Sequence, residues 1–167
     1  IHKLVSPVSD PELPNNGGEI SPEPSLPKLG GVTFKVTALD IDLATNEGWE
    51  QAKALSEAVT AAGNATPAAG VLGSVAGTIT TEDDESSADY GTATLDGLWG
   101  AYLVEETGGG TNVVTRAAPF IVTVPLPTTV AVGEGSQQSW LTDVHVYPKN
   151  GVSVAEKTVD ETGAYGL

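Results

Sequence analysis

The chain has 167 residues, enough for one domain with a sizeable core. Its formal net charge of −15, with only 7 Lys and Arg, argues against nucleic acid and anionic lipid as partners. With no cysteine, it can build neither a disulfide nor a thiolate metal site. No apolar run approaches the roughly 20 residues that span a bilayer, so we expect no membrane insertion within this stretch.

The chain opens with a short alternating stretch and a long irregular one. Residues 1–5 alternate as in a strand, and Lys3 shares the face of the odd-numbered apolar residues. Residues 6–31 carry prolines at positions 7, 11, 14, 22, 24 and 27, and each proline removes a backbone donor. We therefore predict a long surface loop over 6–31, followed by a strand at 32–39.

One helix is predicted, over residues 46–63. Asn46 is a natural N-cap, and Gly63 suits the position after the last turn. Apolar side chains recur between them at helical spacing, at Trp49, Ala52, Leu55 and Val59.

The rest of the chain favours short strands separated by turns. Candidate strands are residues 72–80, 88–95, 98–107, 120–124 and 141–147. This rhythm predicts a mainly β fold, an immunoglobulin-like antiparallel sandwich with one inserted helix. We expect residues 1–150 to form the domain and residues 151–167 to be a linker or the first strand of a following domain. Because Ile1 reads as mid-strand, we expect a piece of a longer precursor whose secretion and anchoring signals lie outside it.

The run from Trp140 to Asn150 carries the strongest functional signal. Its alternation places Val144, Val146 and Asn150 toward a core and Lys149 toward solvent. Pro148 is expected to end the strand just before the lysine. A lysine held at the end of a rigid strand is a plausible nucleophile for an outside partner.

This run resembles the pilin motif of Gram-positive sortase-assembled pilins. The matching positions are Trp140, Val144, Val146, Tyr147, Pro148 and Lys149. Residues 1–4, 31–34 and 118–125 also resemble the N-terminal domain of a major (backbone) pilin of the SpaA type, as does a helix that carries a tryptophan.

The resemblance implies a structural subunit of an extracellular, cell-wall-anchored pilus. In such a pilus a pilin-specific class C sortase cleaves the sorting signal of a neighbouring subunit, and the pilin-motif lysine attacks the resulting acyl-enzyme. Lys149 would then be the acceptor of a covalent polymer. On this interpretation the chain is a substrate of the sortase, with no catalytic residues, cofactor or metal of its own.

Three residues from distant parts of the sequence suggest a second, internal reaction. Lys3 and Asn150 point into the core by parity, and Glu106 shares a face with Tyr102 and Val104. Buried Lys and Glu are rare unless paired, and desolvation would lower the pKa of the Lys and raise that of the Glu. A neutral amine held against the Asn carboxamide can form an isopeptide bond, with the Glu shuttling protons. The alternative is a hydrated Lys–Glu ion pair near the edge of the sandwich.

The same trio resembles the self-cross-linking Cna-B-type domains of Gram-positive surface proteins. Those domains place Lys in the first strand, Asn in the last, and Glu in a Tyr-x-Leu-x-Glu-Thr box. Here the box is 102–107, with Val104 in place of the Leu.

Two other functions remain open from the sequence. The long loops 6–31 and 63–70 would suit an adhesin or ligand-binding domain. A secreted hydrolase has less support, since no carboxylate pair stands out. His2 and His145 read as surface residues without a partner histidine, and the acidic run 82–85 reads as a solvated loop rather than a calcium site.

Overall fold

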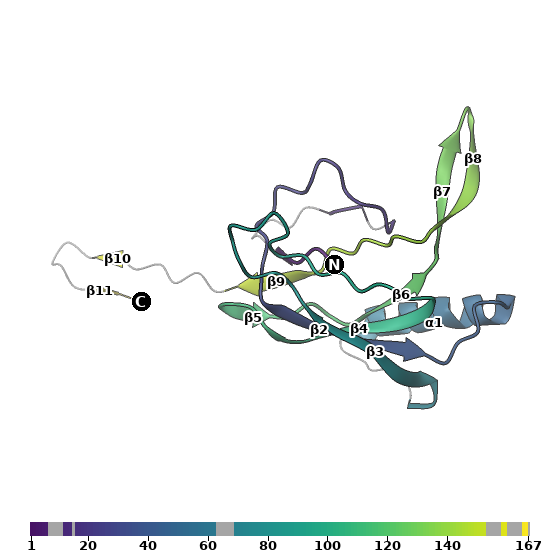
Figure 1. Ribbon diagram of the computed structural model, residues 1–167, viewed down its shortest axis with the longest axis horizontal. Helices are drawn as coiled ribbons and strands as arrows, with labels where there is room; N and C mark the ends of the chain where they lie inside the picture. Colours follow the sequence, from purple (N-terminus) through teal and green to yellow (C-terminus); the bar gives the residue numbers. More distant parts are fainter. Residues whose placement is uncertain (7–11, 15, 63–68, 153–157, 160–164, 167) are drawn as a thin grey trace.

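A computed structural model describes residues 1–6, 12–14, 16–62, 69–152, 158–159 and 165–166. Its centre is a curved antiparallel sheet of four strands in the order β3-β2-β4-β6 (Figure 1). These strands are β2 (Val32–Leu39), β3 (Leu72–Thr80), β4 (Gly100–Gly109) and β6 (Phe120–Val124). Their alternating apolar residues supply one core on each face of the sheet.

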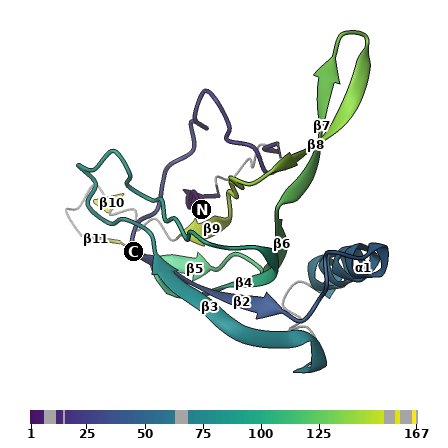
Figure 2. The ribbon, with the colours of Figure 1, turned by 45° about the vertical axis from the view of Figure 1, so that its right-hand side comes forward.

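Helix α1 (Asn46–Ala62) covers one face of this sheet and packs beside β6 (Figure 2). The apolar stripe of α1 meets the odd-numbered residues of β4. The buried members of this core are Leu39, Ile41, Ala52, Ala101 and Leu103. A short 3₁₀ helix, η1 (Ala69–Val71), precedes β3.

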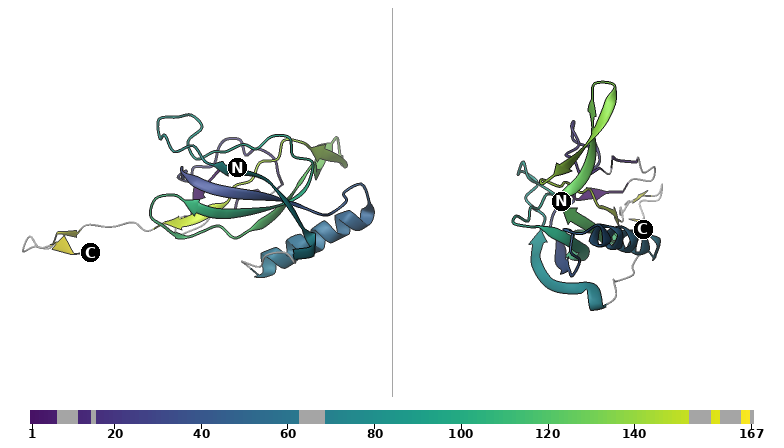
Figure 3. Two further views of the ribbon diagram at one scale, coloured as in Figure 1. Left: turned by 60° about the horizontal axis from the view of Figure 1, so that its bottom comes forward. Right: turned by 90° about the vertical axis from the view of Figure 1, so that its right-hand side faces the viewer.

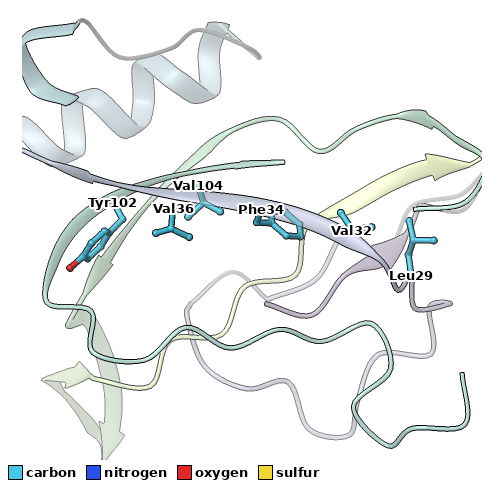
Figure 4. Close-up of a cluster of buried hydrophobic side chains, with 6 residues drawn as sticks. All are labelled: Leu29, Val32, Phe34, Val36, Tyr102 and Val104. Atoms are coloured by element: carbon cyan, nitrogen blue, oxygen red, sulfur yellow. The ribbon is translucent and has the colours of Figure 1, made fainter. Parts of the chain in front are cut away.

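The opposite face is covered by a smaller sheet in the order β1-β9-β5. It consists of β1 (Leu4–Val5), β9 (Lys149–Val152) and β5 (Val113–Thr115). The second core lies between the two sheets, and Figure 4 shows its side chains pointing away from the helix. Its buried members are Leu29, Val32, Phe34, Val36, Tyr102 and Val104.

Two strands leave this body as a hairpin. β7 (Leu126–Val132) and β8 (Gly135–Leu141) pair with each other and project away from the sheets (Figure 3). At the base of the hairpin the Trp140 ring contacts Trp49 of α1, with centroids 5.4 Å apart. Farther along the chain, β10 (Thr158–Val159) pairs with β11 (Tyr165–Gly166).

The predicted fold class is confirmed: the described residues are mainly β, with antiparallel sheets and one α-helix inserted between β2 and β3. The bounds of β2, β3 and β6 agree with the prediction. The described part of 6–31 contains no helix or strand beyond an isolated bridge at Lys28, as expected of a loop. One pairing differs from a purely antiparallel sandwich, because β1 and β9 run parallel.

The start of the helix differs from the prediction. Thr45, not Asn46, is the cap, because its Oγ1 accepts a hydrogen bond from Gly48 N at 3.0 Å. The Thr45 hydroxyl also donates to the Asp42 carbonyl, which fixes it in place. The helix is described to Ala62, so the predicted end at Gly63 lies outside the described residues.

Two predicted strands are wrong. Residues 88–91 form turns, and the stretch beyond them contributes only an isolated bridge between Thr92 and His2. The side chains of Ser87 and Thr92 hydrogen-bond to the Asp89 backbone and compete with a ladder. In the predicted strand 141–147, Leu141 ends β8 and the remaining residues pair with no strand. The β7–β8 hairpin and β5 were not predicted, since their polar residues and exposed valines obscure the alternation.

Candidate functional site

The segment 142–148 crosses the domain as an extended chain held by single hydrogen bonds. His145 N donates to Gly17 O at 2.8 Å, and Val146 O accepts from His2 N at 2.8 Å. The prediction that Pro148 ends a strand is wrong. Instead β9 begins at the next residue, and the Pro148 carbonyl accepts a bond from Leu4 N at 3.1 Å. A proline suits the position before a strand because its missing donor is not needed there.

Lys149 is half-buried and lines a groove of about 430 Å³. The groove is lined by residues of α1, β6, β7, the 6–31 loop and the segment before Lys149: Ser56, Thr60, 120–122, Leu126, Leu13, Pro14, Gly17 and 144–148. The hydroxyl of Tyr147, one of these residues, accepts a hydrogen bond from Ile20 N at 2.8 Å. The pilin-motif residues Val144, Val146, Tyr147 and Pro148 thus shape the approach to Lys149, whereas Trp140 lies on β8 and is 53% exposed.

The structure brings Lys3, Glu106 and Asn150 together in the interior. Lys3 Nζ lies 2.6 Å from Asn150 Oδ1 and 3.1 Å from Glu106 Oε2, and Asn150 Nδ2 donates to Glu106 Oε1 at 2.5 Å. All three side chains are fully buried. Because a carbonyl bond is about 1.2 Å long, the amine nitrogen lies within contact range of the carbonyl carbon of Asn150.

The surroundings of Lys3 make its uncharged form more accessible than that of an exposed lysine. Burial lowers the pKa of Lys3 to about 8, although the Glu106 carboxylate acts in the opposite direction. The Phe34 ring, with its centroid 5.7 Å from Nζ, forms part of the apolar surroundings.

Two neighbours of the trio were missed from the sequence. Arg116 Nη1 lies 3.0 Å from Glu106 Oε1 and 3.1 Å from the Gly109 carbonyl oxygen. The backbone N–H of Ala117 donates to Asn150 Oδ1 at 2.7 Å and to Glu106 Oε2 at 3.2 Å. Arg116 is the single arginine of the chain, and that rarity was the one available signal. A backbone N–H leaves no trace in a sequence.

The two histidines are partners, contrary to the prediction. His2 Nε2 lies 2.8 Å from His145 Nδ1, and His145 Nε2 lies 3.2 Å from Asp143 Oδ2. The His2 ring also stacks on Tyr147, with centroids 4.5 Å apart. Burial, followed by the chain amino group and His145, lowers the pKa of His2. The pairing joins the first residues to the segment before Lys149, a long-range contact that strand parity does not reveal.

Within the described ranges, no group of three or more His, Cys, Asp and Glu is placed to hold a metal ion. The described helices include none that is long and apolar enough to cross a membrane.

The sequence matches the family described as Gram-positive pilin subunit D1, N-terminal domain, over residues 1–151. The chain belongs to this pilin family. The predicted resemblance is therefore confirmed, and the domain is part of a structural pilin subunit. Fimbrial subunit type 2 of Actinomyces naeslundii is 34% identical to this pilin domain over 96% of the chain and 30% of the relative. The chain thus spans about 30% of the length of the curated relatives that it matches.

Solved pilin structures share the fold. The major pilin SpaA of Corynebacterium diphtheriae is 30% identical to this chain, with a TM-score of 0.56. The match covers 99% of this chain and 34% of SpaA. The structure of SpaA points to a modular pilus assembly with stabilizing isopeptide bonds. A solution structure of a SpaA pilin–signal peptide complex from the same organism is 32% identical with a TM-score of 0.60, over 90% of this chain and 94% of that one.

Proposed function

We propose that this domain is the acceptor end of a covalent pilus subunit, with Lys149 as the nucleophile. The observation that carries the proposal is the position of Lys149 in a groove lined by residues of α1, of β6 and of the segment 144–148, which holds the pilin-motif residues Val144, Val146, Tyr147 and Pro148. A groove beside the amine can hold an extended peptide while its acyl group reaches Nζ, and such positioning raises the effective concentration of the reactants.

The peptide would be the cleaved sorting signal of a neighbouring pilin, delivered as an acyl-enzyme by a class C sortase. Apolar side chains line much of the groove, including residues 120–122, Leu126 and Val146, and would bind apolar side chains of that signal. The SpaA pilin–signal peptide complex supports this, since a related domain of similar fold is seen there with a signal peptide. Sortase dependence and an extracellular, cell-wall-anchored pilus are parts of the same proposal.

We also propose that Lys3 and Asn150 form an internal isopeptide bond. The neutral Lys3 amine attacks the side-chain carbonyl carbon of Asn150. Glu106 accepts a proton from the amine and passes it to Nδ2 of Asn150, the C–Nδ2 bond breaks, and ammonia leaves. Glu106 is regenerated, and no oxidant or cofactor is required. The hydrogen bonds of Glu106 to both nitrogens support this route.

On this proposal the domain comprises residues 1–150 and the rest of β9, because Gly151 and Val152 pair with β5. The residues after β9 would lead into a following domain of the same subunit.

Replacing Lys149 tests the acceptor assignment. Lys149→Arg retains the charge but removes the nucleophilic amine, so attachment of a sorting-signal peptide by a pilin sortase should be lost. Lys53→Arg is the matched control, because Lys53 is an exposed lysine on α1 outside the groove. Equal labelling of Lys149→Arg and the wild type in an intact-mass assay would remove Lys149 from this role.

A further inference from the structure

The segment Arg116–Ala117 lies against the internal cross-linking site. Arg116 contacts the carboxyl group of Glu106, and Ala117 N–H contacts both Glu106 and the Asn150 carbonyl oxygen. Neither contact is needed to close a strand, because the segment lies between β5 and β6 and belongs to neither. A role for this segment in cross-linking rests on the proposed isopeptide bond between Lys3 and Asn150.

We propose that Arg116–Ala117 completes the cross-linking site of this domain. The Ala117 N–H binds the oxygen on which negative charge develops, and Arg116 is the counter-ion of Glu106 that lets Lys3 react as a neutral amine.

The position of Ala117 N–H suits an oxyanion donor. A backbone N–H can only donate, so the Asn150 atom 2.7 Å away from it is the carbonyl oxygen rather than the amide nitrogen. As the amine attacks, the carbonyl electrons move onto this oxygen, and a fixed donor in a dry interior stabilises them without reorganisation. The same bond turns Nδ2 of Asn150 toward Glu106, which must protonate it before ammonia leaves.

Arg116 supplies the positive charge that Glu106 needs once Lys3 is neutral. When the Lys3 ammonium loses its proton to the solvent, Glu106 stays a carboxylate and would be left buried without its cation, which is costly. Arg116 Nη1 lies 3.0 Å from Glu106 Oε1, whereas Lys3 contacts Oε2. Because 44% of the Arg116 side chain is exposed to solvent, its charge remains hydrated. Burial is the main cause of the lowered pKa of Lys3, and Glu106 acts against it. The positive charge of Arg116 lowers this pKa further.

The fold holds this segment close to Asn150. Thr115 pairs with Gly151 where β5 joins β9. A Cβ atom at Gly151 would lie 3.2 Å from Thr115 Cβ, a tight contact that a glycine avoids. The residue after Asn150 therefore lets β5 approach closely enough for the N–H of Ala117 to reach the reacting carbonyl.

The test follows bond formation in the full chain. Protein recovered unfolded from inclusion bodies is diluted into buffers from about pH 6 to about pH 10, which spans the Lys3 titration. Loss of ammonia is timed by intact mass, and tryptophan fluorescence reports folding separately. The variants are Ala117→Pro, which removes the N–H, Ala117→Gly, which keeps it, and Arg116→Gln with Arg116→Lys as its charge-retaining control.

We expect the wild-type rate to rise with pH and level off above about pH 8, following the neutral fraction of Lys3. Ala117→Pro should lower the plateau about 100-fold, as loss of an oxyanion donor does, without moving the midpoint, while Ala117→Gly stays near the wild type. Arg116→Gln should move the midpoint to higher pH, and Arg116→Lys should restore it.

The outcomes separate the two proposals. If wild-type protein keeps its ammonia, the internal bond itself is refuted. If it loses ammonia and the folded variants react at the wild-type rate with an unchanged midpoint, the role of Arg116–Ala117 is refuted. Should Ala117→Pro fail to fold, the midpoint of Arg116→Gln decides alone: no shift to higher pH overturns the proposal.

Discussion

Lys149 and Asn150 are neighbours on β9, yet they occupy two different chemical environments. Asn150 is fully buried against a lysine and a glutamate, whereas Lys149 is half-buried along an open groove. The first setting selects a partner within the chain, and the second is open to a partner from outside. The contrast arises because one strand presents alternate residues to opposite sides.

The placement has a mechanical consequence. A load entering at Lys149 passes into β9, which is hydrogen-bonded to β1 in parallel. A covalent link from Lys3 to Asn150 would tie β9 to β1 at the residue next to the attachment point. Lys149 would thus join the subunit to its neighbour, and Lys3 would join the first strand to the last.

The largest predicted effect comes from changing the buried site around Asn150. Glu106→Gln should prevent the internal bond, which otherwise closes a loop of 147 residues. By the chain-entropy estimate such a loop contributes about 5 kcal/mol, or on the order of 10–20 °C in the melting temperature for a domain of this size. Calorimetry together with intact mass checks the result.

A second variant separates the effect of losing the Lys3–Asn150 bond from the effect of losing the Glu106 carboxylate. Lys3→Met removes the amine at similar volume, so it should lose the cross-link and melt lower as well. If both variants retain the ammonia but melt with the wild type, the bond contributes nothing to stability.

The intermediate effect concerns His2, which links the N-terminal residues to the groove segment. Its pKa is lowered in the folded state, so between that value and about 6.5 only the unfolded chain binds the proton. The contribution is therefore present above pH 6.5 and is lost as the pH falls below it, at no more than about 1.4 kcal/mol per pH unit. Unfolding in urea at several pH values should show a steeper loss for the wild type than for His2→Gln. If the stability of the two proteins fell equally with pH, His2 would make no such contribution.

The smallest effect should come from Glu105, the neighbour of Glu106 on the opposite face of β4. Its carboxylate pairs with Lys35 at 2.9 Å, with 21% and 40% of the two side chains exposed. Glu105→Gln should cost about 0.2–1 kcal/mol in denaturant unfolding and leave the internal bond intact. A loss as large as that of Glu106→Gln would show that burial does not distinguish the two carboxylates.

Strands could be predicted from the sequence where buried and exposed residues alternate clearly along them. β2 alternates between buried and partly exposed residues over most of its length, and its bounds were predictable. The hairpin β7–β8 is exposed on much of its surface, so burial imposed little alternation on it. The run 141–147 alternates like a strand but is held by single bonds from distant residues such as Gly17, which no local pattern encodes.

The trio of the internal site was predictable for a physical reason. Strand parity placed the side chains of Lys3 and Glu106 inward, and charged residues placed inward need partners. Asn150 was placed inward by the alternation of residues 141–147, which form no strand, although Asn150 is indeed buried on β9. The roles of Arg116 and Ala117 could not be predicted, because they lie between β5 and β6, where strand alternation does not indicate the direction of a side chain. In addition, Ala117 makes its contact through the backbone N–H, which is the same for nearly every residue type. The half-buried state of Lys149 likewise depends on α1 and β6, which approach it only in three dimensions.

Peptide mapping of one sortase reaction tests the central claim most directly. The full chain is incubated with a pilin sortase and a sorting-signal peptide, then digested and sequenced by mass spectrometry. We predict the signal peptide on Lys149 Nζ and, in the same molecules, a Lys3–Asn150 cross-link with the loss of one ammonia. Attachment at any other lysine would contradict the acceptor assignment, and unlinked Lys3 and Asn150 peptides from folded protein would contradict the internal bond.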